Sequence, residues 1–281
     1  MRKLLVGLAI PALIFALAFA CLSTGILVPK KSFAAHRALI AAHTARLDPD
    51  GAPRGVVLLF HGCGGVRSAV EDWAQVFRRA GYVALTVDSL AAHGMSRLGG
   101  FAFVCTGLAL WGQERAGDVL AALGSARADP DLADLPVALA SWSHGGWAAM
   151  EALGFAPGEL PWGLEDALAG LTDGLAGVLF AYPYCGWASS PRAARWHARP
   201  PALALLAGRD SVVGAEPCIA RFTDAIEDGY PIEVHVYPDA DHSFDERTRN
   251  EFGRLAYDPA VTQDAFARGI AFLDRVSASG R

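Results

Sequence analysis

The stretch that decides the fold is Val137-Ala138-Leu139-Ala140-Ser141-Trp142-Ser143-His144-Gly145-Gly146. Its first four residues form a short apolar run typical of a buried strand, and a helical pattern begins at Gly146. Between them, small-x-Ser-x-Gly is the pattern of a nucleophile elbow, a tight strand-to-helix turn that lifts a serine hydroxyl clear of a sheet. A serine-rich turn is the alternative, but a position between strand and helix disfavours it. The stretch therefore predicts an α/β fold with Ser143 as a nucleophile.

The alternation of strand and helix patterns continues on both sides of this turn. Short apolar runs predict strands at 56–60, 82–87, 137–140, 176–182, 202–206 and 232–237. Helical patterns lie at 34–46, 70–80, 113–126, 146–153, 216–227 and 260–276. Such alternation is typical of a mostly parallel sheet with helices on both faces. Right-handed crossovers bring the carboxyl ends of the strands to one edge, where ligands bind. We expect residues 32–281 to form one domain with its site at that edge.

A glycine-rich turn, His61-Gly62-Cys63-Gly64-Gly65, ends the first of these strands. Glycines let the backbone turn tightly beneath a substrate, with amides pointing inward. We expect the backbone N–H groups of Cys63 and of His144, the residue after the nucleophile, to form an oxyanion hole. An ordinary glycine-rich turn is the alternative, and a phosphate loop is disfavoured because no Gly-Lys-Ser/Thr follows. His61 is expected to have a structural role.

A serine nucleophile needs a histidine base and a carboxylate that orients the imidazole, in the chain order Ser, Asp or Glu, His. Of the histidines after Ser143, only His242 follows the last strand at the functional edge. The others lie at the elbow, before the acid or inside a strand: His144, His197 and His235. Asp210 follows strand 202–206, and no other carboxylate lies between Tyr182 and Asp210. A surface turn is the alternative for Asp210. These positions predict a Ser143–Asp210–His242 triad.

With these motifs in place, the chain from about Gly55 to its end resembles the dienelactone hydrolase family of the α/β-hydrolase superfamily. The resemblance is carried by the glycine-rich turn, the elbow, Gly208-Arg209-Asp210 and Asp241-His242-Ser243-Phe244. It implies an α/β-hydrolase fold and hydrolysis of a carboxylic ester or lactone through an acyl-enzyme, with no cofactor. Two positions depart from the family. The dienelactone enzymes have a cysteine nucleophile where this chain has Ser143, and a glutamate where it has Gly62. The chain therefore looks like a serine-type relative.

Three other functions stay open at this point. The Ser-His-Gly-Gly elbow also resembles that of the prolyl oligopeptidase group, which implies a peptidase, although no propeller-sized N-terminal region is present. Acyl transfer to an acceptor other than water needs the same residues as hydrolysis. A catalytically silent hydrolase fold, kept as a binding or envelope protein, is the third alternative. A complete triad disfavours it, because a silent relative usually loses one member.

Substrate contacts are less clearly marked than the triad. Trp142 is expected to line the pocket, with the protein core as the alternative. Arg97, Arg209 and His93 are candidates to contact a substrate carboxylate. The connection 89–111 is long and unusually apolar. It is expected to form part of the pocket or to lie against a membrane, and a packed surface loop is the alternative.

The N-terminus indicates export. Met1-Arg2-Lys3 precedes an uncharged run over residues 4–28, and Pro29-Lys30-Lys31 follows it. A helix of that length crosses a bilayer core of roughly 30 Å. Residues 1–31 are therefore expected to be a cleaved secretory signal or an uncleaved membrane anchor, with acylation of Cys21 a weaker third alternative. The protein is expected to be periplasmic or otherwise extracytoplasmic. A net charge of −5 disfavours a nucleic-acid partner.

The other four cysteines each follow a predicted strand, so all should lie near the functional edge: Cys63, Cys105, Cys185 and Cys218. An even number in an exported chain favours disulfides. Because sequential parallel strands are usually neighbours, we expect Cys63 to pair with Cys105, and Cys185 with Cys218. No close C-x-x-C pair occurs, so no metal site is expected.

Overall fold

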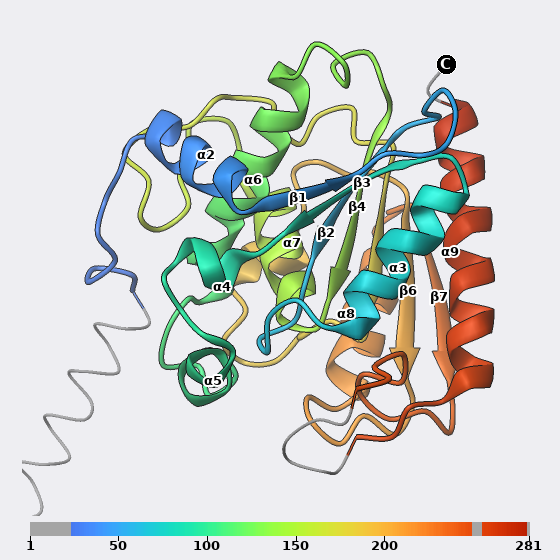
Figure 1. The fold of residues 1–281 in the computed structure, drawn as a ribbon. Coiled ribbons are helices and arrows are strands. Elements are labelled where there is room, and N and C mark those ends of the chain that lie inside the picture. The colour runs from blue at the N-terminus through green and yellow to red at the C-terminus, as the bar shows by residue number, and fades with distance from the viewer. Residues whose placement is uncertain (1–23, 249–254, 280–281) are drawn as a thin grey trace, which may run out of the picture.

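A seven-stranded sheet forms the centre of the protein in the computed structural model, which describes residues 24–248 and 255–279 (Figure 1). Its spatial order is β1-β3-β2-β4-β5-β6-β7, and every neighbouring pair is parallel except β1 and β3. The strands are β1 (Thr44–Leu47), β2 (Val56–Phe60), β3 (Val83–Val87), β4 (Val137–Trp142), β5 (Gly177–Ala181), β6 (Ala202–Ala207) and β7 (Ile232–Tyr237). The predicted mostly parallel α/β fold is confirmed.

Helices cover both faces of the sheet, and α3 and α9 lie together on one of them (Figure 1). Successive residues of β2 divide the core accordingly, because side chains alternate along a strand. Leu58 packs in the cluster that includes α6, α7 and α8, while Val57 and Leu59 pack with α3 and α9. The helices are α2 (Phe33–Ala42), α3 (Ser68–Arg79), α4 (Ser89–Ala92), α5 (Arg97–Gly99), α6 (Gly112–Ala128), α7 (His144–Gly154), α8 (Glu216–Glu227) and α9 (Pro259–Ser279).

The segment 34–46 differs from its prediction as one helix. The helix ends at Ala42, and the chain then turns into β1, whose Thr44 pairs with Val87 and whose Leu47 pairs with Ala84. Thr44 still donates its hydroxyl to the Ile40 carbonyl at 2.8 Å, which closes the end of the helix. The strand has only four residues and their burial does not alternate, so its pairing with β3 defines it. The sheet therefore has one antiparallel edge strand that the sequence pattern did not indicate.

The connection 89–111 contains more structure than the expected loop. It forms α4, α5 and a short π-helical turn at Gly100–Val104. The Phe101 ring lies over Gly64 so closely that a side chain there would collide with it, and a Cβ on Gly100 would meet the Cys63 carbonyl. Leu98 is 69% exposed. The segment thus packs directly against the glycine-rich turn after β2.

The predicted signal or anchor, with its membrane contact through residues 4–28, lies almost entirely outside the described residues. Within 24–248 and 255–279, none of the helices combines the length and the apolar composition needed to cross a membrane.

Candidate active site

Ser143 occupies a strained turn between β4 and α7. Its φ of 49° and ψ of −114° are unusual for a residue with a side chain, as expected for an elbow. A Cβ at Gly145 would collide with the backbone oxygen of Phe60, and one at Gly146 would collide with Pro183. The glycines therefore let α7 start directly beside β2. The turn leaves the Ser143 hydroxyl at the carboxyl edge of the sheet.

His242 and Asp210 reach Ser143 from the loops after the last two strands. His242 Nε2 lies 3.0 Å from Ser143 Oγ, and His242 Nδ1 lies 2.7 Å from Asp210 Oδ2. If Nδ1–H donates to the carboxylate, Nε2 is free to accept the serine proton. All three side chains are almost fully buried. The structure thus brings the three residues of the predicted triad together in one chain of hydrogen bonds.

The acid is held by its own loop. Its Oδ1 accepts from the backbone N–H groups of Val212 and Val213, at 3.0 and 2.8 Å. Burial alone would raise the pKa of Asp210, but the hydrogen bond and charge of His242 and these two amides hold the pKa below its ordinary value. Asp241 ties the two loops together, because it accepts from the amides of both Ser211 and His242. Asp210 is therefore an ionised, oriented carboxylate at neutral pH.

The glycine-rich turn approaches Ser143 from β2. An added Cβ on Gly62 would lie 3.4 Å from the Ser143 Cβ, so the turn passes directly over the nucleophile. His144 is the first residue of α7, and its amide is one of the N–H groups without an acceptor inside the helix. The predicted oxyanion donors, Cys63 and His144, thus belong to two backbone segments that meet at Ser143.

Arg115, which the sequence reading missed, lies beneath both of these segments. This fully buried side chain donates to Ser89 Oγ at 3.0 Å, and its Nη atoms lie 3.2 Å from His144 Nδ1 and from His61 Nδ1. Burial is the main cause that lowers the pKa of His144, to about 3, and the Arg115 charge is the second. The same two causes hold the pKa of His61 well below its ordinary value. Both imidazoles are therefore neutral, and the structural role expected for His61 agrees with its place here.

A second missed group supports His242 from behind. The Tyr182 ring packs against the His242 ring with centroids 4.7 Å apart, and Tyr182 Oη donates to Asp245 at 2.5 Å. Asp245 is buried and also accepts from the indoles of Trp73 and Trp142, at 2.8 and 3.1 Å. Burial raises the pKa of Asp245 despite these three donors. This network fixes the plane of the His242 imidazole.

The structure places most of the expected substrate-contact residues in other interactions. Trp142 is 2% exposed and packs in the core against Trp73, so the core alternative describes it and a place in the pocket was wrong. His93 is engaged by Asp118 at 3.1 Å, and exposed Arg209 pairs with Asp239 at 2.5 Å. Arg97 is exposed on α5, with its aliphatic part beside Gly65. A contact between Arg97 and substrate stays a prediction.

Both expected cysteine pairs lie at disulfide-bonding distance. The Cα atoms of Cys63 and Cys105 are 5.0 Å apart, and those of Cys185 and Cys218 are 5.1 Å apart. These separations are ordinary for disulfides. The first pair joins the glycine-rich turn to the end of the π-helical turn that packs over it. It therefore restrains the backbone that carries the Cys63 amide.

Removing the first pair should reduce activity more than removing the second. Each closes a loop of similar length, with sequence separations of 42 and 33, so each is expected to contribute roughly 3–4 kcal/mol to the free energy of unfolding. The Cys63→Ser/Cys105→Ser variant keeps the backbone N–H at position 63 but removes the covalent restraint on the glycine-rich turn over Ser143. We expect a lower kcat for this variant, measured well below its melting temperature. The Cys185→Ser/Cys218→Ser variant is the matched control, and equal kcat values in the two variants would contradict the expectation.

Comparison with known proteins agrees with this fold. A family model described as "Dienelactone hydrolase family" matches residues 42–277, which is most of the chain. The fold and this family match together define an α/β hydrolase that acts on esters. More particularly, the chain belongs to the dienelactone hydrolase family. No curated protein sequence matches it.

Solved structures share the fold at low sequence identity. A putative dienelactone hydrolase from Klebsiella pneumoniae is 16% identical with a TM-score of 0.62, over 83% of this chain and 92% of that one. A dienelactone hydrolase-like promiscuous phosphotriesterase from metagenomic libraries is 17% identical with a TM-score of 0.58, over 81% and 88%. Esterase 2 of Thermogutta terrifontis, with bound propionate, is 15% identical with a TM-score of 0.58, over 83% and 89%. At these identities the likeness concerns the fold.

Proposed function

We propose that the protein is a serine esterase or lactonase that forms an acyl-enzyme on Ser143. The observation that carries the proposal is the hydrogen-bonded series Asp210–His242–Ser143, at 2.7 and 3.0 Å, on a strained elbow. The substrate is a small carboxylic ester or lactone, and no cofactor takes part. A silent hydrolase fold is disfavoured, because the geometry of all three residues is intact.

Each residue has a defined role in this proposal. The Ser143 oxygen attacks the substrate carbonyl while His242 Nε2 takes its proton, and Asp210 stabilises the resulting imidazolium. The carbonyl oxygen becomes an oxyanion that accepts hydrogen bonds from the amides of Cys63 and His144. His242 then returns the proton to the departing alkoxide. Water repeats the sequence on the acyl-enzyme, releases the acid and restores the serine.

A serine instead of a cysteine at the elbow, and Gly62 where the dienelactone enzymes have a glutamate, favour ordinary ester chemistry. No carboxylate stands at position 62 to interact with the nucleophile. Two cysteine pairs at disulfide-bonding distance are consistent with an oxidising, extracytoplasmic compartment. We therefore place the activity outside the cytoplasm, with the N-terminal segment acting as a signal or an anchor.

A screen of activated substrates tests the proposed reaction. Purified protein is assayed on p-nitrophenyl esters of increasing acyl length, on aliphatic lactones and on a peptide p-nitroanilide. We expect turnover of short esters, of lactones or of both, and none of the anilide. Added alcohol would be converted to a new ester if acyl transfer prevailed over hydrolysis. Turnover of the anilide alone would overturn the proposal in favour of a peptidase.

The pH dependence should contain a single acid limb. The imidazole must be neutral to accept the serine proton, so kcat/KM should rise with pH between roughly 5 and 8. The pKa of Asp210 lies below its ordinary value, so its carboxylate stays ionised over that window and adds no second proton. A plot of log(kcat/KM) against pH should therefore rise with a slope of one on its acid side before it levels off. A flat profile from pH 5 to 9 would count against a histidine base.

A further inference from the structure

Two histidines and an aspartate meet in a buried cluster that the proposed reaction does not use. His36 lies on α2, His93 directly follows α4, and Asp118 lies on α6. Their ligand atoms lie within 4.8 Å of one another. Glu114 precedes Asp118 by four residues on the same helical face. These residues are far apart in the sequence and form no motif, which explains why no metal site was expected.

The distances within the cluster suit a metal ion. His36 Nε2 lies 2.9 Å and His93 Nε2 lies 3.1 Å from the same atom, Asp118 Oδ1. Zinc binds imidazole nitrogen and carboxylate oxygen at about 2.0–2.2 Å. In the tetrahedral geometry of zinc, two ligands at that distance are about 3.3 Å apart. The separation of each imidazole nitrogen from Asp118 Oδ1 is therefore within a few tenths of an ångström of the separation between two ligands of one ion.

The burial of the Asp118 carboxylate is a second reason to expect a metal ion here. Asp118 is 0% exposed, and its Oδ2 has no hydrogen-bond partner among the described residues. Its other oxygen, Oδ1, contacts the Nε2 atoms of both histidines. The two imidazoles contact Oδ1 alone and leave Oδ2 unsatisfied. A buried anion with a spare oxygen is a strong ligand for a divalent cation.

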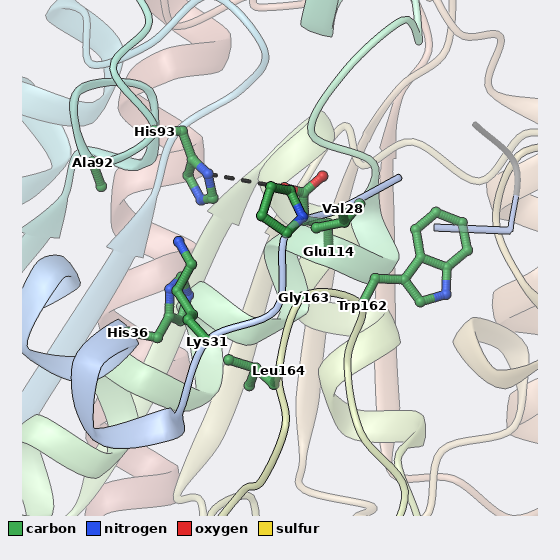
Figure 2. Close-up of a pocket in the computed structure, with 10 residues that line it drawn as sticks. Val28, Lys31, His36, Ala92, His93, Glu114, Trp162, Gly163 and Leu164 are labelled. Atoms are coloured by element: carbon green, nitrogen blue, oxygen red, sulfur yellow. Dashed lines mark ion pairs between the residues drawn. The ribbon is translucent and has the colours of Figure 1, made fainter. Parts of the chain in front are cut away.

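The two histidines of the cluster also line a cavity, with a further carboxylate beside them. A cavity of about 250 Å³ is lined by His36, His93, Glu114, Lys31 and Trp162, among others (Figure 2). Figure 2 shows the His93 ring directed at Glu114, whose Oε1 lies 3.9 Å from Nδ1. A carboxylate on the far nitrogen of a ligating histidine is common in metal sites. The cavity leaves room for water or an anion as a further ligand.

We propose that His36 Nε2, His93 Nε2 and Asp118 form a site for a divalent transition metal, of the Zn²⁺ class, that opens into this cavity. Two imidazoles and one carboxylate are a ligand set that prefers such ions to Mg²⁺ or Ca²⁺. Glu114 supports His93 from the second coordination layer. The site is separate from the triad, so the proposal stands or fails independently of the proposed esterase reaction.

Zinc titration of the whole protein tests the proposal. Protein with its disulfides intact and Cys21→Ser is stripped with EDTA, and Zn²⁺ is added in competition with a chromophoric chelator. We expect one Zn²⁺ per chain with a Kd of about 1 µM or tighter, unaffected by millimolar Mg²⁺. His36→Gln and His93→Gln should each weaken binding about 100-fold or more. Glu114→Gln should weaken it about 10-fold, as outer ligands do.

The control is His235→Gln, which removes a partly exposed histidine on β7 and should leave the affinity unchanged. Circular dichroism checks that each variant is folded. If a variant does not fold, zinc binding is followed instead by ¹H–¹⁵N spectra of the histidine rings in the wild-type protein. One equivalent of Zn²⁺ should then shift two ring Nε2 signals. Absence of binding at 100 µM Zn²⁺, or unaltered binding by a folded His36→Gln/His93→Gln protein, would overturn the proposal.

Discussion

Replacing Ser143 by alanine should lower kcat/KM for p-nitrophenyl acetate by a factor on the order of 10⁴–10⁶. The reason is that no other group can form the acyl-enzyme at this position. The hydroxyl is 3.0 Å from His242 Nε2 and is held there by the strained backbone of the elbow. Alanine removes only the oxygen, so the fold should survive. Initial rates with purified wild-type and variant protein measure the effect.

The matched control is Ser141→Ala, two residues earlier on β4. Its hydroxyl is buried and donates to the Leu179 carbonyl at 3.1 Å, away from the histidine. Loss of that hydrogen bond is expected to cost about 1 kcal/mol of stability and to leave kcat/KM within a few-fold. If Ser143→Ala kept most of the activity while remaining folded, the nucleophile would be another residue.

Asp210→Asn should lower kcat by about 10⁴. An amide in place of the carboxylate can donate to His242 Nδ1, which favours the tautomer that carries its proton on Nε2. That tautomer cannot accept the proton of Ser143. The amide also gives no charge to stabilise the imidazolium. Because asparagine can still accept from the amides of Val212 and Val213, the loop should keep its shape.

Asp239→Asn provides the comparison for a charge lost nearby. Asp239 lies on the loop after β7, but its carboxylate is exposed and pairs with Arg209. An exposed pair contributes little, so this variant should have nearly wild-type kcat. A loss of less than 10-fold in Asp210→Asn would show that Asp210 does not orient the base.

The central strands were predictable because each is an uninterrupted apolar run between helical patterns. All five residues of β2 are buried, as a strand covered on both faces requires. Edge strand β1 was not predictable, since its four side chains are exposed or only half-buried and its pairing with β3 is a tertiary property. For the same reason the sequence could not tell that helix α2 ends at Ala42.

The candidate site divides in a similar way. Ser143, Asp210 and His242 follow strands at one edge, and chain order selects them. Arg115 could not be selected, because it lies in the first turn of a helical pattern and is buried by tertiary packing against neighbouring elements. Asp245 follows His242 closely, but its role depends on indoles and a phenol from other elements. Trp142 was misplaced because strand neighbours of a nucleophile point to opposite faces of the sheet.

The most direct measurement is covalent labelling with a fluorophosphonate, which reacts with an activated serine, followed by mass spectrometry of the peptides. Wild-type protein at pH 7.5 should gain one phosphonyl group per chain, on Ser143. Labelling should be lost in Ser143→Ala, greatly slowed in Asp210→Asn and retained in Ser141→Ala. A wild-type protein that hydrolyses esters but stays unlabelled, or carries the label on another residue, would contradict the assignment of Ser143 as the nucleophile.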